Sequence, residues 1–306
     1  MTTPAAPPLP LDQPLPFRQI LDEAVKQTRR HFRRIYPYVA IPLALMGGLV
    51  PLAQGLFFRD AFQGVGSNKA PDLTRMIVGF GTFGVVVLAF TVVYGLGYGA
   101  MFAAATDALS GREVSMRRAW GLVVRPRVLG TLLLLGLAVM VGFAFCVLPG
   151  IYLGLLYAFT VPVVVAESRF GRAAMSRSAE LAHYNPQGQL DSDPRLQVFI
   201  TVMVGTMLGY MINLLFQLPL IAFQQFVLMR EVAAGRKADP AELMARLTWI
   251  QVPSNMMGML TNTAVHLYVC FGIALLFFDL KRRKEGLDLE AAVASLVERH
   301  RLRRQP

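Results

Sequence analysis

The sequence carries little charge. Only 16% of its 306 residues are Asp, Glu, Lys or Arg, whereas about 25% is typical of a soluble globular domain. The charges are also bunched, and they leave long runs without any charged residue. These runs are 35–58, 76–106, 128–166, 196–229 and 247–278. A helix needs about 20 apolar residues to cross about 30 Å of hydrocarbon, so each run is long enough to span a membrane. The composition argues against a soluble enzyme and predicts a polytopic membrane protein.

Cysteines and motifs of known chemistry are scarce as well. Cys146 and Cys270 are the only cysteines, and they fall in different charge-free runs at different predicted depths. We therefore expect neither a disulfide nor a thiolate metal site. The sequence contains no phosphate-binding loop, zinc-hydrolase motif or nucleophile elbow. His266 is the one residue inside a predicted span that titrates near neutral pH. We expect no catalytic residue, no cofactor and no metal, with a membrane-embedded enzyme as a lesser alternative.

The number of spans follows from the lengths of the runs. The run 128–166 is too long for one crossing, and Pro149 and Gly150 favour a break within it. We predict an all-α transmembrane bundle with spans at 38–58, 77–104, 129–147, 151–166, 198–222 and 256–278. The fourth span is short, which leaves two arrangements open for the third and fourth. They either cross fully or form a re-entrant hairpin.

Basic residues are distributed unevenly between the two sides of this bundle. One side carries 23 of the 30 Lys and Arg residues and the other side carries seven. Because basic loops stay in the cytoplasm, both termini are predicted to be cytoplasmic, in a multi-pass protein of the cytoplasmic (inner) membrane. Anionic lipid headgroups on the cytoplasmic face are the expected partners of these charges. No nucleic-acid-binding motif accompanies them, so we expect no nucleic acid partner.

The segments that flank the bundle have their own patterns. Residues 1–16 contain six prolines and almost no charge, which predicts a disordered tail. Residues 17–36 alternate apolar and basic residues at helical spacing, which predicts a basic amphipathic helix in the headgroup layer, or else the solvated start of the first span. The membrane domain is then 37–279. Residues 280–306 form a basic tail, and Leu289, Val293, Leu296 and Val297 predict a second amphipathic helix within it.

An acidic residue followed by arginines recurs in the cytoplasmic segments. The stretch from Asp107 is echoed 60 residues later from Glu167, and Asp279 occupies a similar place after the last span. A carboxylate at a helix C-terminus opposes the helix dipole, so a nearby arginine is the natural partner. We favour structural ion pairs over a functional role for these residues. The predicted ion-pair motif comprises Asp107, Arg112, Arg117, Glu167, Arg172, Arg177, Asp279 and Arg282.

Uncharged polar residues lie on one face of the fifth span and one face of the sixth. Asn213 and Gln217 are predicted to lie at the depth of Asn262 and His266, where the amides would satisfy one another. We favour interhelical hydrogen bonding for this polar seam, with a substrate or headgroup path as the alternative. The candidate seam comprises Asn213, Gln217, Asn255, Asn262 and His266.

Two stretches resemble a known family. The segment VVVAESRFGRAAMSRSAEL, 163–181, and the segment FFDLKRRKEGLDLE, 277–290, are similar to the membrane domain of some bacterial glycerophosphodiester phosphodiesterases and of stand-alone YciC-like inner-membrane proteins. The positions that match in the first segment are Glu167, Ala174, Arg177, Ser178 and Leu181. The resemblance implies a fold rather than a reaction, because the phosphodiesterase activity belongs to a separate barrel domain for which this chain has no room. Family members often have glycine and tryptophan where this chain has His183, Tyr184, Asn185 and Pro186.

The expected function follows from these patterns. We expect an integral membrane protein without intrinsic catalysis that acts as an envelope or membrane-organising module. A membrane or cytoplasmic protein is a further expected partner, besides lipid. The alternative is a transporter or lipid-handling permease that uses the polar seam between spans five and six.

Overall fold

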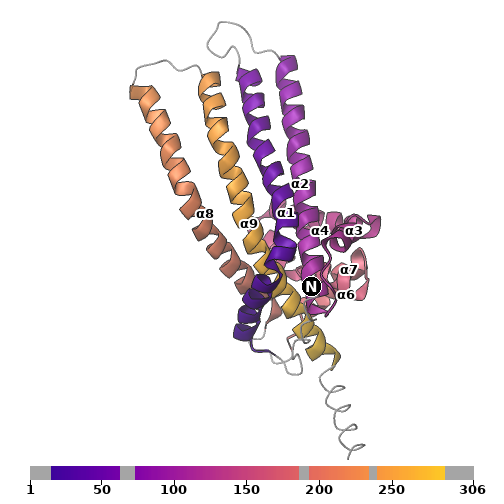
Figure 1. Cartoon of the computed structure of the whole chain (residues 1–306). Coiled ribbons are helices and arrows are strands. Elements are labelled where there is room, and N and C mark those ends of the chain that lie inside the picture. Colours follow the sequence, from indigo (N-terminus) through magenta and orange to yellow (C-terminus); the bar gives the residue numbers. More distant parts are fainter. Residues whose placement is uncertain (1–14, 63–72, 186–192, 234–239, 287–306) are drawn as a thin grey trace, which may run out of the picture. The chain divides into compact units, whose positions relative to one another are not determined.

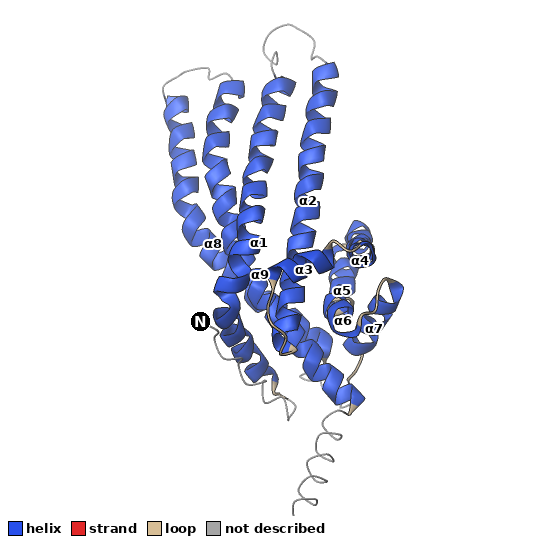
Figure 2. Ribbon diagram, turned by 45° about the vertical axis from the view of Figure 1, so that its right-hand side comes forward, coloured by secondary structure: helices blue, strands red, loops and turns tan. Residues whose placement is uncertain are grey.

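The computed structural model describes residues 15–62, 73–185, 193–233 and 240–286, and these residues form α-helices without strands (Figures 1 and 2). The helices are α1 Phe17–Phe62, α2 Leu73–Leu109, α3 Met116–Val123, α4 Pro126–Phe145, α5 Val147–Leu156, α6 Thr160–Glu167, α7 Arg172–Ala182, α8 Pro194–Ala233 and α9 Pro240–Glu285. Six helical segments are long and apolar enough to cross a membrane, with α5 and α6 together forming one of them. This architecture confirms the predicted all-α, polytopic transmembrane class.

The chain divides into two compact units. The first unit contains residues 1–34, 99–205 and 267–306, and the second contains 35–98 and 206–266. Four helices, α1, α2, α8 and α9, therefore contribute one part to each unit. Helices α3 to α7 belong to the first unit alone.

Glycines let the helices of the second unit approach one another closely. A side chain at Gly47 in α1 would collide with Met259 of α9, and one at Gly209 in α8 would press on Val265 of α9. Close approach through glycine is a common mode of helix packing in membranes. These contacts place α9 beside both α8 and α1 within this unit (Figure 1).

Large apolar side chains cover the outside of the second unit. Val85 and Met211 are both 67% exposed, and neighbouring residues on α1, α2 and α8 behave alike. Soluble monomers rarely expose apolar patches of more than a few hundred Å². The exposed apolar surface of the second unit therefore fits helices that cross a membrane.

The first unit has a packed apolar core. Its largest fully buried side chains include Phe159, Phe271, Phe277, Ile20 and Leu181. The start of α1 packs on the end of α9, where the rings of His31 and Phe271 stack with 5.8 Å between their centroids.

Residues 17–36 do not form a separate element. Helix α1 continues without a break from Phe17 to Phe62, so the structure has no helix boundary at residue 36. Ile20 and Ala24 are buried, while the six basic residues of this segment are exposed. The amphipathic pattern is present, and Ile20 and Ala24 on its apolar side pack within the first unit.

The predicted segments at the two ends fall mostly outside the described residues. Residues 1–14 of the expected disordered tail lie outside the described residues, and so do residues 287–306 of the basic tail 280–306, which include its expected amphipathic helix. Leu15 is described, and both its backbone N–H and its backbone carbonyl form hydrogen bonds. Its N–H donates to Asp279 Oδ1 at 3.1 Å, and its carbonyl accepts from Arg283 Nη2 at 3.0 Å.

A break divides the long run 128–166 as predicted, slightly earlier than expected. Helix α4 ends at Phe145, Cys146 has extended backbone angles, and α5 starts at Val147. Pro149 lies in the first turn of α5, where its missing N–H is tolerated because the first helical N–H groups have no partner within the helix.

Candidate functional site

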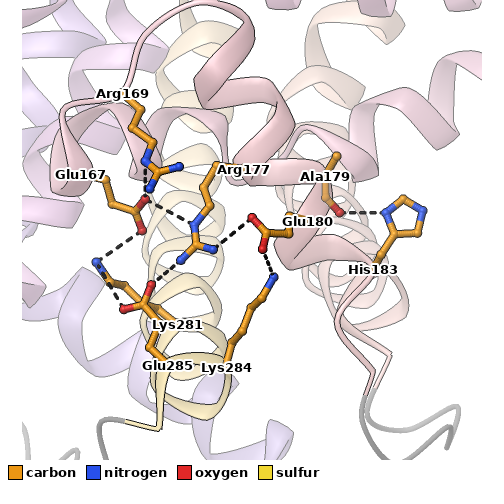
Figure 3. A network of polar contacts seen from close by, with 9 residues as sticks. All are labelled: Glu167, Arg169, Arg177, Ala179, Glu180, His183, Lys281, Lys284 and Glu285. Carbon is orange, nitrogen blue, oxygen red and sulfur yellow. Dashed lines mark hydrogen bonds and ion pairs between the residues drawn. The ribbon is translucent and has the colours of Figure 1, made fainter.

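Charged side chains from α6, α7 and α9 meet in one network of the first unit (Figure 3). Glu167, at the end of α6, is its centre. One carboxylate oxygen, Oε2, lies 3.3 Å from Arg177 Nε and 3.4 Å from Arg169 Nε. The other oxygen, Oε1, lies 3.3 Å from Lys281 Nζ. Since the Glu167 side chain is only 8% exposed, three cations compensate a carboxylate that has lost most of its water.

Arg177 links this centre to two further carboxylates. Its guanidinium donates to Glu180 at 3.1 Å and also to Glu285, and its side chain is 9% exposed. Lys284 donates to the second oxygen of Glu180. Burial alone would lower the pKa of Arg177, but the hydrogen bond to Glu180 and the surrounding carboxylates raise that pKa above its usual value. The arginine therefore stays charged and acts as a fixed cross-link between helices.

Two residues with positive φ lie in the connection between α6 and α7. Ser168 follows α6 with φ of 54°, and Gly171 precedes α7 with φ of 59°, both in the left-handed region. Glycine adopts this region without steric cost. The Gly171 N–H donates to Thr131 Oγ1 of α4 at 2.7 Å, which ties the start of α7 to that helix.

Ser178 closes the break between α5 and α6. Its hydroxyl donates to the Leu156 carbonyl at 3.0 Å and accepts from the Phe159 N–H at 3.1 Å. Both backbone groups belong to the interrupted segment between the two helices and would otherwise lack these partners. A buried, unsatisfied backbone group costs about 1–3 kcal/mol, so this serine stabilises an irregular backbone inside the protein.

The structure brings together part of the ion-pair motif predicted from the sequence. Asp107 lies 3.3 Å from the predicted Arg112 and 3.8 Å from Arg118. The second cation beside Asp107 is Arg118, and not its neighbour Arg117, which was expected in the motif. The two repeats are therefore not equivalent in their pairing.

The other two acidic positions also differ from the prediction in detail. Glu167 pairs with the predicted Arg177, whereas Arg172 is exposed to solvent. Asp279 pairs with Arg283, one turn along α9, at 2.8 Å. The predicted Arg282, three residues after Asp279 on α9, also acts electrostatically on this carboxylate.

Several members of the network were missed at the sequence level. They are Arg169, Glu180, Lys281, Lys284 and Glu285. Lys281 and Glu285 are four residues apart on one helix, and this spacing alone predicts the ion pair that they form. The contacts between α7 and α9 cross about 100 residues of sequence, and no local pattern predicts them.

The predicted polar seam is not assembled as one site. In α8, Gln217 Nε2 donates to Asn213 Oδ1 at 3.0 Å, so the two amides satisfy each other within their own helix. They do face α9, but their neighbour there is Gly258. Asn262, expected opposite them, lies one turn further along α9 and is exposed, as is Asn255.

His266 faces α2 within the second unit, and not the two amides. Its Nε2 lies 3.1 Å from the Tyr94 hydroxyl, and its Nδ1 lies 2.7 Å from the Asn262 carbonyl of the preceding turn. The ring also meets the Tyr98 ring edge-on, with 5.2 Å between centroids. The histidine is thus held by Tyr94 and Tyr98 of α2, and no local sequence pattern predicts these contacts.

The residues that carry the family resemblance prove to be packing residues. Ala174, Ser178 and Leu181 are fully buried, and Glu167 and Arg177 pair with each other. In the described part of the chain, no group of three or more His, Cys, Asp or Glu side chains could hold a metal ion. Comparison of the chain with family models, with curated proteins and with solved structures finds no match.

Proposed function

We propose that the chain is a multi-pass protein of the cytoplasmic (inner) membrane, with both termini in the cytoplasm, that organises the membrane or envelope without catalysing a reaction. The observation that carries this proposal is the basic face of α1. Its six basic residues are exposed, whereas Ile20 and Ala24 on the same helix are buried. These residues are Arg18, Lys26, Arg29, Arg30, Arg33 and Arg34.

The position of this face fits anionic lipid headgroups as its partner. The basic residues end where the charge-free run of α1 begins at Ile35, so they would lie at the membrane surface. A basic residue near an anionic surface contributes about 1 kcal/mol to binding. The face is held rigidly, because α1 packs on α9 through its apolar side.

The ion-pair network supports a structural role in the same unit. Its carboxylates are engaged by arginine and lysine, which leaves Glu167 occupied as an ion-pair partner for α7 and α9. Such a cluster fixes helices in one arrangement. A permease is supported less well, because Asn213 with Gln217 and His266 face different helices.

The resemblance to the YciC-like membrane domain agrees with this proposal. We propose membership of that family on the residues of α7 and on the end of α9. The buried Ser178 and the paired Arg177 give these similar positions a physical reason, namely the packing of α7.

Native mass spectrometry of the protein, extracted in its own lipid patch, tests the lipid proposal. The variant replaces Arg29, Arg30 and Arg33 by glutamine, and a control variant of equal charge replaces Arg117, Arg125 and Arg172, which are also exposed. We expect wild type and control to retain anionic lipid and the first variant to lose it.

Three other results would contradict the proposal. Equal lipid retention by all forms would remove the role of α1. A retained small molecule that is lost on replacing Asn213 and Gln217 by leucine would favour a permease. Turnover of a substrate by the purified protein would establish an enzyme.

A further inference from the structure

The turn between α4 and α5 is apolar and exposed. Phe145, Val147 and Leu148 around it are 83%, 61% and 74% exposed. Turns that face water are rich in Gly, Asn, Asp and Ser, whereas the exposed side chains of this turn are mainly apolar. Both backbone groups of Cys146 are used within the hairpin, through the Gly142 carbonyl at 3.1 Å and the Gly150 N–H at 3.3 Å. The turn therefore suits a lipid environment, where an unpaired backbone group is costly.

The two arms of this hairpin stay in contact up to the turn. A Cβ atom at Gly142 would lie 2.9 Å from the Cα of Gly150, and the ring of Phe143 covers Gly150. Each glycine lies four residues from Cys146. The hairpin is consequently closed at its tip, with no polar side chain between the arms there.

The short arm reaches only part of the way through a bilayer. Helix α5 has ten residues, which gives about 15 Å at 1.5 Å per residue. Ser178 then binds the backbone where α5 ends, and Ser178 lies beside the ion-paired Arg177 on α7. The end of α5 is thus at the level of a charged helix, about half of the 30 Å hydrocarbon thickness from the tip.

Polar groups approach even nearer to the tip on the side of Tyr152. The Tyr152 hydroxyl lies 3.5 Å from His183 Nε2. Tyr152 also interacts electrostatically with Arg195, which pairs with Asp193 at 2.9 Å. Tyr152 follows Cys146 by six residues, which is about 9 Å along a helix. If the hairpin crossed the whole bilayer, this ion pair would lie in the hydrocarbon, where charged groups are expensive.

We infer that α4 and α5 form a re-entrant hairpin whose tip, around Cys146, is inserted among the acyl chains of a single leaflet. The two arms enter and leave on the side of α7, so the third and fourth apolar segments do not cross the membrane. The ligand of this surface is the lipid hydrocarbon of that leaflet. Such a wedge adds area to one leaflet only, which is a physical means of shaping a membrane. The placement itself does not depend on the proposed organising role or on the basic face of α1.

The native cysteines allow a direct test in the full-length chain. Cys146 is exposed on the protein surface, while Cys270 is fully buried, so Cys146 is the one thiol of the wild-type protein that a membrane-impermeant maleimide can label when lipid does not shield it. Replacement of Cys146 and Cys270 by alanine together with Ser176→Cys gives the reference, since Ser176 is exposed on α7. A spin label at Cys146 in a Cys270→Ala variant then reports collisions with oxygen and with a water-soluble nickel chelate.

We expect Cys146 to lose labelling from both faces of intact vesicles and to regain it in detergent, while the reference thiol labels from the α7 face. The spin label should collide with oxygen and be shielded from nickel. Labelling of Cys146 from the opposite face would overturn the inference, because the arms would then cross the membrane. Labelling of Cys146 from the α7 face would also overturn it, because the tip would lie in water.

Discussion

Helix α2 buries its side chains in one unit and exposes them in the other. In the first unit, every residue from Ala100 to Ala105 is at most 3% exposed. In the second unit, Ile77, Val85 and Leu88 are more than 60% exposed. Both stretches lack charge, so hydropathy does not separate them. Residue size does, since four of the six buried residues are alanine and the exposed ones are large and aliphatic. Small residues admit neighbouring helices, and large ones meet lipid.

The two units also satisfy polar groups in different ways. The first unit relies on ion pairs, as at Glu167 and Asp279. The second unit relies on uncharged contacts, such as Gln217 with Asn213 and Tyr94 with His266. Charges are costly in hydrocarbon, while neutral hydrogen bonds are tolerated there. Within the long helices α8 and α9, these uncharged contacts therefore lie in the second unit, and the ion pairs of α9 lie in the first.

The largest effect is expected from removing the central arginine of the first unit. Arg177→Met leaves the mostly buried carboxylate of Glu167 with less compensation, and breaking a buried pair costs about 3–5 kcal/mol. Thermal unfolding in lipid nanodiscs would measure the loss. Arg172→Met is the matched control on the same helix, and because Arg172 is exposed its effect should stay within about 0.5 kcal/mol. Equal effects at both positions would show that the network does not stabilise the unit.

Enlarging one residue in each part of α2 tests the comparison itself. Ala103 is fully buried, so Ala103→Leu forces an overpacked core and should cost about 1–3 kcal/mol. Val85→Leu adds a methylene to a side chain that is 67% exposed, and it should leave the unfolding temperature unchanged. The same unfolding assay compares the two. A large loss for Val85→Leu would mean that protein covers this face of α2, and not lipid.

A smaller effect is expected at the polar contact of the second unit. His266→Leu removes the hydrogen bond to Tyr94, and such bonds in membranes contribute about 0.6–2 kcal/mol. Asn262→Leu should cost nothing, because its side chain is exposed and only its carbonyl is used. Thermal unfolding in detergent measures the stability of each variant relative to wild type. Destabilisation by Asn262→Leu alone would restore a seam that includes this amide.

The spans could be predicted from the sequence because charge-free length is a local property. Pattern also placed Asn213 and Gln217 on one face of α8, and they do bond to each other. Their depth relative to α9 was misjudged by one turn, since helical periodicity fixes a face but not the register between two helices. Likewise, a rule about helix ends finds Glu167 but cannot choose between Arg172 and Arg177. That choice depends on how α7 turns at Gly171, which is a tertiary property.

The smallest effect concerns the solvent-facing edge of the ion-pair network and depends on pH. Hydrogen bonds from Lys284 and Arg177 lower the pKa of Glu180 below its usual value of 4.5. A lowered folded pKa adds stability that is complete above about pH 4.5 and is lost as pH falls through the folded pKa. Because Glu180 is about half exposed, solvent screening should keep this contribution under about 1 kcal/mol. Glu180→Gln should therefore lower the unfolding temperature at neutral pH, and the difference from wild type should vanish in acid and shrink at high salt. A difference that persists in acid would show that Glu180 acts through packing, and the outer edge of the network would then resemble the uncharged contacts of the second unit.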